Sequence, residues 1–392
     1  MTPGRTPEAR PPVRAPRAPS PRPLVDIVSG SFGAGHDAAA REIARLLQAR
    51  GFATRTSDVV DLMPGRLGHA LRAGYLHQVQ SAPATWSWLL RVLETHPAAT
   101  RGVVRALGAA DAGLLSLAAD RPELIVSTHP FASQALGALR AAGRLAVPVA
   151  TYLTDMSVHP LWVHPAVDLH LALHELPAAE ARRRGAGRTT VVRPAVPDVP
   201  VPGSAATLPA RRALGLPADE PLVLVVGGSC GIGDLERTAR EVAATGLAVP
   251  VVLCGRNDRL RARVAAGGHA VALGWVDDVP ALLGAVDAVV QNAGGFTSLE
   301  TLAAGVPVLS YRCIAGHGET NARTLDAAGL VPWARSRPEL SPLLAGLLLA
   351  GRRPGAPATW GRRPDVVDAL SPYLRTPSAL VPAGGPPYGS VA

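Results

Sequence analysis

Short apolar runs alternate with segments of helical periodicity along most of the chain. For example, Ile43, Leu46 and Leu47 share one face of a helix expected at His36–Arg50. Strands that alternate with helices are typical of parallel sheets built from βαβ units, so we expect an α/β fold. The strands expected in the first half are Leu24–Ser29, Ala53–Val59, Leu124–Ser127, Val147–Leu153, Leu169–Leu173 and Thr190–Val192. Those expected in the second half are Leu222–Val226, Val251–Cys254, Ala270–Leu273, Ala288–Gln291 and Val306–Ser310.

The two halves begin with the same pattern. The stretch LVDIVSGSFGAGH from Leu24 aligns without a gap with LVLVVGGSCGIGD from Leu222, and each is a strand, a glycine-rich turn and the start of a helix. A stretch rich in Pro and Ala, Pro194–Pro209, separates them. Convergence on what a βα turn requires is an alternative explanation for so short a match. Together with the linker, the repeat predicts two Rossmann-like domains that face each other across a cleft.

These patterns divide the chain into five parts. We expect a disordered Pro/Arg-rich arm at 1–23, a Rossmann-like domain at 24–193, a linker at 194–218, a second Rossmann-like domain at 219–350, and a C-terminal segment with a disordered tail at 351–392. The arm has no apolar core of the kind found in secretory signals. No later stretch has the uninterrupted apolar length expected of a transmembrane helix.

Composition narrows the class of partner. The 392 residues carry a formal net charge of +9, and all of the basic side chains are arginine. Arginine suits acidic partners such as nucleotides, nucleic acid or anionic lipid, although a bias of composition is an equal explanation in a chain so rich in Ala, Gly and Pro. The three cysteines, Cys230, Cys254 and Cys313, lack metal-ligand spacing and predict no disulfide framework, which favours a reducing cytoplasm.

The first glycine turn has two interpretations. Gly33 to Ala38 satisfies the dinucleotide pattern G-x-G-x-x-A, and Asp58 ends the next strand, where a ribose-binding acid would lie. Glycines there also suit a tight turn with no ligand. The free N–H groups at the start of the following helix favour an anion.

A second turn, Gln291 to Glu300, ends a strand in Asn-Ala-Gly-Gly before a helix. Backbone amides and Thr297 could bind a diphosphate at the helix N-terminus, and Glu300 could accept both hydroxyls of a ribose. The alternative is that Thr297 caps the helix and forms a capping box with Glu300.

Several motifs in one order resemble a known family. They are the Gly-Ala-Gly-His turn at Gly33, Ser-Thr-His-Pro at Ser127, Thr-Asp-Met-Ser at Thr154 followed by His159-Pro160, Trp162 and His164-Pro165, Gly-Gly-Ser at Gly227, Cys-Gly-Arg-Asn at Cys254, and Gly-Gly-Phe-Thr-Ser-Leu-Glu at Gly294 followed by Ala-Ala-Gly-Val-Pro-Val. From about Leu24 to Trp333 the chain resembles GT-B glycosyltransferases of the monogalactosyldiacylglycerol synthase and processive diacylglycerol glucosyltransferase group, which is glycosyltransferase family 28-like.

The resemblance implies an inverting transfer of a hexose from a UDP-sugar to a lipid hydroxyl, with no metal and no cofactor. It implies that the second domain binds the UDP-sugar. The implied donor-binding positions are Gly33, Gly35, Gly228, Ser229, Arg256, Val276, Gly294, Gly295, Phe296, Thr297, Glu300, His317 and Asn321. The family's Pro-Gly-Gln-Glu appears here as Ala315-Gly316-His317-Gly318, so the donor sugar stays open.

His36 and Asp155 are the candidate catalytic residues. A histidine near neutral pKa can remove the proton of an acceptor hydroxyl that attacks an anomeric carbon. Asp155 could orient that imidazole, act as the base itself, or only bond local amides. The spacing of the other histidines argues against zinc.

The segment Met63–Leu107 raises the question of the acceptor. It predicts helices in which aromatic and aliphatic residues are flanked by arginines, and such helices suit an anionic membrane surface, although they also suit packing on the protein's own sheet. In the resembled family this region approaches the lipid, so we expect the first domain to bind the acceptor and the enzyme to lie on the inner face of the cell membrane. The acceptor or membrane candidates are Trp86, Trp88, Arg91 and His129.

Three other functions are compatible with parts of the sequence. One is a transferase of the same fold with a soluble or polyprenyl-linked acceptor. The others are an NAD(P)-dependent oxidoreductase, which Asp58 favours, and a protein that binds a nucleotide sugar without turnover. A nucleic-acid partner is not expected, because the chain has few aromatic residues and no recognised nucleic-acid module. The sequence does not indicate the oligomeric state.

Overall fold

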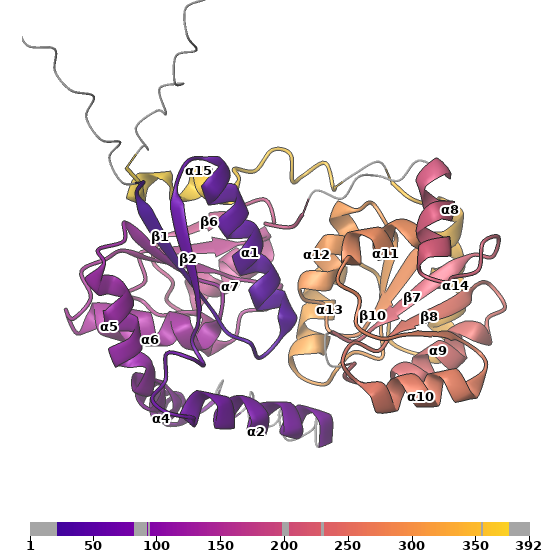
Figure 1. Ribbon diagram of the computed structural model, residues 1–392, viewed down its shortest axis with the longest axis horizontal. Coiled ribbons are helices and arrows are strands. Elements are labelled where there is room, and N and C mark those ends of the chain that lie inside the picture. The colour runs from indigo at the N-terminus through magenta and orange to yellow at the C-terminus, as the bar shows by residue number, and fades with distance from the viewer. Residues whose placement is uncertain are drawn as a thin grey trace, which may run out of the picture.

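Two parallel six-stranded sheets form the two halves of the protein (Figure 1). The computed structural model describes residues 22–81, 92, 95–197, 204–228, 231–353 and 356–375. The first sheet has the order β2-β1-β3-β4-β5-β6, and the second has the order β12-β11-β10-β7-β8-β9. The α/β class with two Rossmann-like sheets is therefore confirmed. The termini expected to be disordered lie almost wholly outside the described residues.

The strands follow the apolar runs of the sequence. In the first half they are β1 (Leu24–Ser29), β2 (Ala53–Asp58), β3 (Leu124–Ser127), β4 (Val149–Tyr152), β5 (Leu169–Ala172) and β6 (Thr189–Val191). In the second half they are β7 (Leu222–Val226), β8 (Val249–Leu253), β9 (Val271–Leu273), β10 (Ala288–Gln291), β11 (Val308–Tyr311) and β12 (Trp333–Ala334). Strands β3, β4, β5 and β7 are buried at every position, as expected when helices cover both faces of a parallel sheet.

The repeated sequence lies at equivalent places in the two halves. Each copy ends an inner strand, since β1 lies between β2 and β3 and β7 lies between β10 and β8. The first turn leads into α1 (Ala34–Ala49), and the second leads into α9 (Leu235–Ala243). The helix begins earlier in the first copy, so His36 lies inside α1, whereas the aligned Asp234 is the N-cap of α9.

Helices cover both sheets. The other helices of the first half are α2 (Leu67–Ser81), α4 (Pro97–Leu107), α5 (Asp111–Ala119), α6 (Pro130–Ala141) and α7 (Glu175–Arg183), with 3-10 turns η1 (Gly108–Ala110) and η2 (Pro160–Trp162). Those that follow are α8 (Ser204–Ala213), α10 (Asp258–Gly267), α11 (Val279–Ala285), α12 (Phe296–Ala303), α13 (His317–Ala327), α14 (Arg337–Ala350), α15 (Val366–Leu370) and η3 (Ser371–Tyr373). Helix α8 lies inside the expected linker.

One helical stretch bears on the expectation about membrane spans. Within the described residues, the helical stretch Thr100–Ala119 is long and apolar enough to cross a membrane, by length and composition only. The stretch is not an uninterrupted apolar run, because it contains the charged residues Arg101, Arg105 and Asp111. Its Leu107 and Leu114 are buried in the core of the first half.

The last described segment returns to the first half. Helix α15 packs beside α1, where Arg50 forms ion pairs with Asp365 (2.8 Å) and Asp368 (3.0 Å) (Figure 1). Val366 and Leu370 are fully buried in a core cluster that includes residues of both sheets. The segment after β12 therefore ties the second half to the first.

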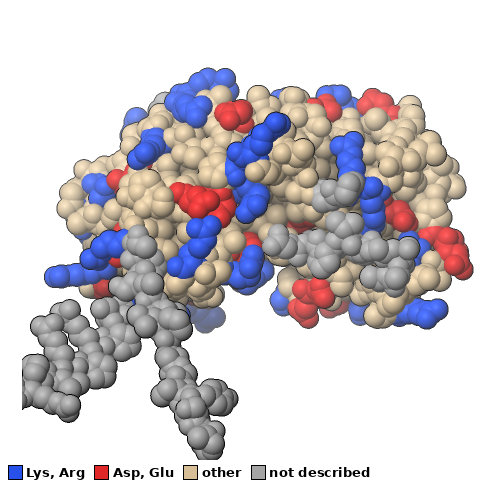
Figure 2. All heavy atoms as spheres, turned by 90° about the horizontal axis from the view of Figure 1, so that it is seen from above, with Lys and Arg blue, Asp and Glu red and all other residues tan. Residues whose placement is uncertain are grey.

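Charges of both signs are spread over the face that carries α15. Among the described residues that this view shows, arginine and acidic side chains lie interspersed (Figure 2).

Candidate active site

His36 projects from the first turn of α1 and is held in one tautomer. Its Nδ1 lies 2.8 Å from the carbonyl oxygen of Thr128 and 3.1 Å from the Oγ1 of Thr154. A carbonyl oxygen only accepts hydrogen bonds, so Nδ1 carries the proton and donates it. The lone pair is then on Nε2, which is the arrangement a general base needs.

Aromatic rings surround the His36 imidazole. The His129 ring lies edge-on at 4.6 Å between centroids, and the Trp162 ring lies at 5.9 Å. His129 is buried, stacks on Phe32, and accepts a hydrogen bond from the Phe131 amide as the N-cap of α6. Burial lowers the pKa of His129 well below its usual value. His129 therefore packs as a neutral support under His36, and contact with a membrane surface is not available to it.

Asp155 follows β4 and faces both halves. Its Oδ2 accepts a hydrogen bond from the indole of Trp162 at 3.2 Å, and its Oδ1 accepts one from the amide of Asn321 at 3.3 Å. The carboxylate also lies 3.5 Å from where a Cβ on Gly295 would be. Asp155 thus contacts residues around His36 rather than the imidazole Nδ1, whose partners are Thr128 and Thr154.

The first glycine turn packs on the second half. Gly33 is the N-cap of α1, and a Cβ added to Gly35 would lie 2.9 Å from the Cβ of Phe296 in α12. Only glycine permits that approach of the two helix N-termini. Asp58 is engaged within the turn itself, since it accepts hydrogen bonds from the amides of Ser31 (3.2 Å) and Val60 (2.9 Å). Asp58 is therefore not a free ribose-binding acid, which weakens the oxidoreductase interpretation.

The side chain of Gln291 fixes the shape of the second turn. The side-chain oxygen of Gln291 accepts hydrogen bonds from the amides of Ala293 (2.8 Å) and Gly294, and Gly294 has a positive φ of 66°. The N-cap of α12 is Gly295, with no side-chain cap. Thr297 is the second residue of the helix, so the capping-box alternative is wrong. At the start of α12 the Ser298 amide donates to the Gly295 carbonyl at 3.0 Å, and the amides of Phe296 and Thr297 lie at the helix N-terminus, where an anion is favoured.

Glu300 lies one turn into α12, where its side chain is half-buried. Desolvation is the main cause that raises its pKa to about 7, while the charge of Arg41 lowers it. Within the part of the chain that the structure describes, no hydrogen bond reaches its carboxyl group. A desolvated acid without a partner is costly and commonly marks a ligand site.

The loop after β9 carries an exposed aromatic platform. The guanidinium of Arg256 lies 4.2 Å above the ring of Trp275, which donates a hydrogen bond to Asp277 at 2.7 Å. Val276 is half-buried beside this pair and packs on the core. The sequence indicates Arg256 and Val276 but not the stacking on Trp275. The nearby Gly228 has a positive φ of 69°, and Ser229 lies outside the described residues.

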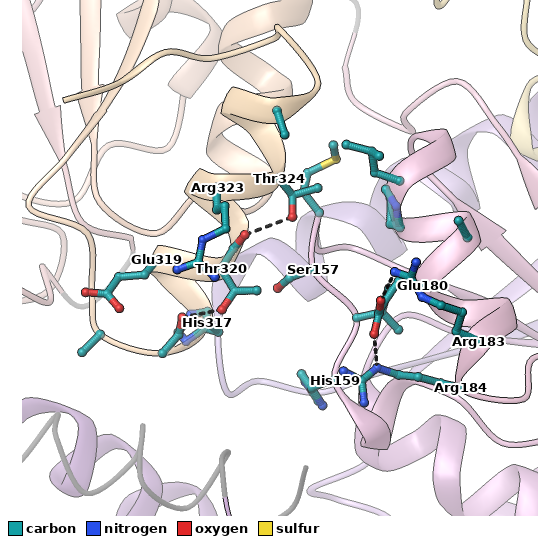
Figure 3. A pocket seen from close by; sticks show the side chains of 18 residues that line it. Ser157, His159, Glu180, Arg183, Arg184, His317, Glu319, Thr320, Arg323 and Thr324 are labelled. Atoms are coloured by element: carbon teal, nitrogen blue, oxygen red, sulfur yellow. Dashed lines mark hydrogen bonds and ion pairs between the residues drawn. The ribbon is translucent and has the colours of Figure 1, made fainter. Parts of the chain in front are cut away.

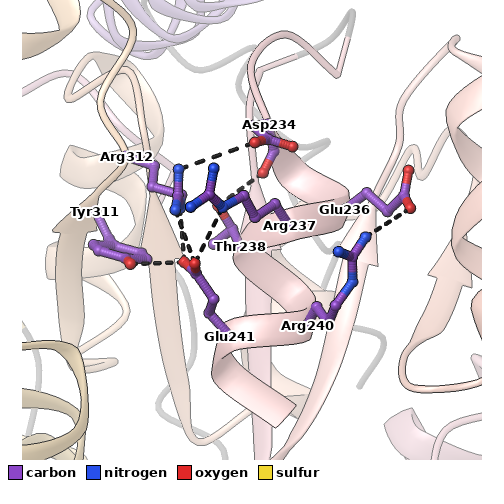
Figure 4. Close-up of polar contacts among 8 residues, drawn as sticks. All are labelled: Asp234, Glu236, Arg237, Thr238, Arg240, Glu241, Tyr311 and Arg312. Carbon is purple, nitrogen blue, oxygen red and sulfur yellow. Dashed lines mark hydrogen bonds and ion pairs between the residues drawn. The ribbon is translucent and has the colours of Figure 1, made fainter. Parts of the chain in front are cut away.

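A buried network positions the start of α13. Glu241 accepts hydrogen bonds from Tyr311 and Arg312, both at 2.7 Å, and from Arg237 at 3.2 Å (Figure 4). The Arg312 hydrogen bond is the main cause that lowers the pKa of Glu241 to about 2. Arg312 has a positive φ of 46°, so the network holds a strained turn that leads from β11 to His317.

Asn321 joins the two halves. It is fully buried, its Oδ1 accepts the Ser157 amide at 2.7 Å, and its Nδ2 donates to Asp155 and to the carbonyl of Ala293 at 3.1 Å. The sequence does not predict the contacts of Asn321 with Ser157 and Ala293, because each of these residues contributes a backbone atom.

A pocket of about 600 Å³ opens between α7 and α13 (Figure 3). Its walls come from the loop 156–159 and α7 in the first half and from residues 315–327 in the second half. His159 and His317 both line it, one from each half.

Three of the acceptor or membrane candidates, Trp86, Trp88 and Arg91, lie outside the described residues. Among the residues that are described, no group of three or more His, Cys, Asp or Glu side chains is arranged to hold a metal ion.

The two facing halves have the fold of GT-B glycosyltransferases. The glycosyltransferase SsfS6 of Streptomyces sp. SF2575, solved with thymidine diphosphate, aligns with a TM-score of 0.57 and 16% identity over 89% of this chain and 99% of its own. The Anabaena protein Alr3699/HepE, solved with UDP-glucose, aligns with a TM-score of 0.52 and 14% identity over 90% and 98% of the two chains.

Sequence comparison identifies similar proteins of one group. Residues 36–195 match the family model of monogalactosyldiacylglycerol (MGDG) synthase. The chloroplastic monogalactosyldiacylglycerol synthase 1 of Arabidopsis thaliana is 29% identical over 57% of this chain and 45% of its own. The processive diacylglycerol beta-glucosyltransferase of Bacillus subtilis (strain 168) is 24% identical over 53% of this chain and 56% of its own. The resemblance to this group is confirmed, and the chain spans about half the length of the curated relatives that it matches.

Proposed function

We propose that the protein is an inverting, metal-independent glycosyltransferase that moves a hexose from a UDP-sugar to a hydroxyl of a membrane lipid, with diacylglycerol as the acceptor. The observation that carries the proposal is His36, whose Nδ1 donates to a backbone carbonyl where the N-termini of α1 and α12 meet. That geometry suits proton removal beside an anion site. The relatives named after diacylglycerol and MGDG support the acceptor.

The donor would bind in the second half. The N-terminal amides of α12 and the glycine turn before α9 suit a diphosphate. The unpartnered carboxylate of Glu300 suits a pair of ribose hydroxyls, and Arg256 and Val276 suit the base. The UDP-glucose bound to the Anabaena protein supports a nucleotide sugar as the ligand.

The reaction then follows from these positions. The acceptor oxygen attacks the anomeric carbon from the face opposite UDP, while Nε2 of His36 takes the hydroxyl proton. The bond from the anomeric carbon to the diphosphate oxygen breaks, and UDP leaves with that electron pair. Helix N-termini stabilise the charge on the departing diphosphate. Attack from the opposite face inverts the configuration.

The lipid would approach over α2. Leu67 and Leu71, one turn apart on α2, are 42% and 46% exposed. Arg72 on the same helix donates to the carbonyl of Ser31 at 2.7 Å, and Tyr75 packs edge-on against Phe32 at 5.4 Å. The exposed helix is thereby attached to the turn that carries His36. We infer a peripheral position on the inner face of the cell membrane, with anionic lipid as partner.

Transfer assays test the proposal. Full-length protein with each radiolabelled UDP-hexose should label diacylglycerol in anionic vesicles. Labelling of a soluble or polyprenyl-linked acceptor alone would reject the diacylglycerol acceptor. Binding of UDP-sugar with no transfer to any acceptor would favour the non-catalytic alternative.

A further inference from the structure

Three hydroxyl groups are buried side by side beneath the loop that follows β3. Ser127 ends β3 and pairs in register with Thr151 of β4, so both side chains lie on one face of the sheet, where they meet Ser133 of α6. The Oγ of Ser133 lies 2.9 Å from that of Ser127, and the Oγ1 of Thr151 donates to Ser133 at 2.9 Å. All three residues are fully buried. A buried polar network whose members satisfy one another makes its surroundings rigid.

This hydroxyl triad, which consists of Ser127, Ser133 and Thr151, holds both backbone groups of His129. The Oγ of Ser127 accepts the His129 N–H at 3.3 Å and donates to the His129 carbonyl at 2.9 Å. The Oγ of Ser133 lies 3.2 Å from the same carbonyl oxygen. The two peptide groups that flank His129 are therefore fixed in orientation.

One of these peptide groups also holds His36. The N–H of His129 and the carbonyl of Thr128 belong to the same peptide, and that carbonyl accepts the Nδ1 proton of His36 at 2.8 Å. Because a peptide group is planar, fixing its N–H also fixes the direction of its carbonyl. The hydroxyl of Ser127 and the imidazole of His36 thus bond opposite ends of one rigid group.

The direction of that carbonyl matters because the Nδ1 of His36 has a second neighbour. The Oγ1 of Thr154 lies 3.1 Å from Nδ1, and a hydroxyl group can either donate or accept a hydrogen bond. If the Thr128 carbonyl turned away, the Thr154 hydroxyl would be free to donate to an unprotonated Nδ1. The proton would then lie on Nε2, which would no longer be able to take one from an acceptor hydroxyl.

We propose that Ser127, supported by Ser133 and Thr151, is a positioning residue for His36, because it fixes the peptide whose carbonyl selects the tautomer of the base. The inference rests on the proposed function and deepens it. Ser127 acts through the peptide between Thr128 and His129 and not through contact with a substrate.

Four variants of the full chain test this role. Ser127→Ala removes the hydroxyl and Ser127→Thr restores one, while Ser133→Ala removes part of the support. Thr245→Val is the matched control. The Oγ1 of Thr245 accepts the Leu247 amide at 3.3 Å, as Ser127 accepts the amide two residues on, but it lies just after the end of α9. Thermal unfolding of each variant checks that the fold is retained.

Nitrogen NMR of protein with ¹⁵N-labelled histidine reports the tautomer at pH 8, and transfer assays give kcat and KM. His36→Gln identifies the signals of His36, and His77, an exposed histidine on α2, supplies a reference. We expect Ser127→Ala to move the His36 proton from Nδ1 toward Nε2. It should lower kcat by about 5- to 30-fold, while KM for the UDP-hexose changes by less than about twofold.

Ser127→Thr should recover most of the loss, and Ser133→Ala should give a smaller change in the same direction. Thr245→Val should keep the wild-type tautomer and kcat. If Ser127→Ala has the wild-type tautomer or the wild-type kcat, the positioning role is rejected. An equal loss of kcat in Thr245→Val also rejects it. If Ser127→Ala does not fold, the same readings on Ser133→Ala decide.

The two proposals fail in different ways. Wild type that transfers no hexose to any acceptor rejects the proposed function. The tautomer comparison does not depend on turnover, so in that case unchanged His36 signals in Ser127→Ala reject the positioning of the imidazole, and changed signals support it.

Discussion

The tautomer of His36 is set by the backbone carbonyl of Thr128, a group that every residue type would supply at that position. We predict that His36→Ala lowers kcat by about 10²- to 10⁴-fold, because proton removal from the acceptor is lost. UDP affinity should stay within about twofold of wild type. Initial-rate transfer assays and UDP titration measure the two effects, with His77→Ala as control.

Turnover of His36→Ala at the wild-type rate would mean that another group takes the proton. Asp155 is the alternative, and Asp155→Asn would then carry the large loss of kcat.

The raised pKa of Glu300 predicts how the stability of the fold depends on pH. Its pKa is about 7 in the folded protein, against an ordinary value of 4.5, so the native state holds a proton that the unfolded state releases between these values. Stability from this group is therefore present below about pH 4.5 and is lost as pH rises through 7. We predict that Glu300→Gln raises Tm relative to wild type at pH 8, with little difference at pH 5.

The same substitution should weaken UDP binding at pH 8 by at least about tenfold, because an amide cannot accept both ribose hydroxyls as a carboxylate does. Glu220→Gln is the control, since Glu220 is exposed. If Glu300→Gln gains stability but binds UDP as tightly as wild type does, Glu300 does not bind the ribose.

The sequence predicts His36 and Glu300 because each lies at a fixed distance from a glycine turn. It does not predict the carbonyl of Thr128, which comes from a loop 92 residues away and is common to every residue type. The interpretation of Asp58 as a ribose-binding acid is weakened for the same reason. Its spacing suits a ribose, but its carboxylate is engaged by the Ser31 amide, and spacing does not reveal such contacts.

At the scale of elements, α13 connects the halves through Asn321. We predict that Asn321→Ala lowers the free energy of unfolding by about 1–3 kcal/mol, because the Ser157 amide and the Ala293 carbonyl lose their partner in a buried place. Urea denaturation measures the change. The control is Arg323→Ala on the same helix, where the side chain is exposed, and an equal loss in the control would contradict the role of Asn321.

The exposed leucines of α2 lead to a prediction about vesicle binding. Replacing both Leu67 and Leu71 by Glu should weaken binding to phosphatidylglycerol vesicles by at least about tenfold, because each leucine would otherwise bury apolar surface in the lipid. The matched control places the same charges at His69 and Ala73, on another face of α2. Vesicle co-sedimentation compares the two, and equal losses would show that charge alone matters.

The local sequence pattern predicts α1 well but does not predict helix α8 or strand β12. Helix α8 contains Pro209 and lies in a stretch whose composition predicts a linker. Strand β12 is only two residues long, too short for an apolar run to indicate it. Tertiary packing defines both, so the local sequence carries little signal.

At the scale of the molecule, the segment from Trp360 to Arg375 returns from the second half and packs on the first, where Arg363 donates to the Leu173 carbonyl and Arg50 pairs with Asp365. Trp360 is 2% exposed and belongs to the core cluster that contains residues of both sheets. We predict that Trp360→Ala lowers the free energy of unfolding by about 3–5 kcal/mol. Arg50→Ala breaks only exposed ion pairs to α15 and should cost less than about 1 kcal/mol.

Denaturation followed by fluorescence and by calorimetry compares these two variants. A small effect of Trp360→Ala would indicate that the returning segment is not needed for the fold.

The alternation of strands and helices and the repeated glycine turn predict two parallel sheets, and the structure confirms them. Neither pattern predicts that α15 crosses back to α1, since residues 50 and 365 are far apart in sequence and their pairing leaves no local pattern. Strand order within each sheet is likewise a property of the packed chain.

The contact between Gly35 and Phe296 offers an experimental handle. A methyl group at position 35 would lie 2.9 Å from the Phe296 Cβ, so Gly35→Ala would act as a wedge, which pushes the N-termini of α1 and α12 apart and keeps the two halves from closing fully. The second half of such a protein would still load nucleotide, while chemistry would stall. Comparing how donor and acceptor protect the wedged and native enzymes would reveal the order in which the two substrates enter.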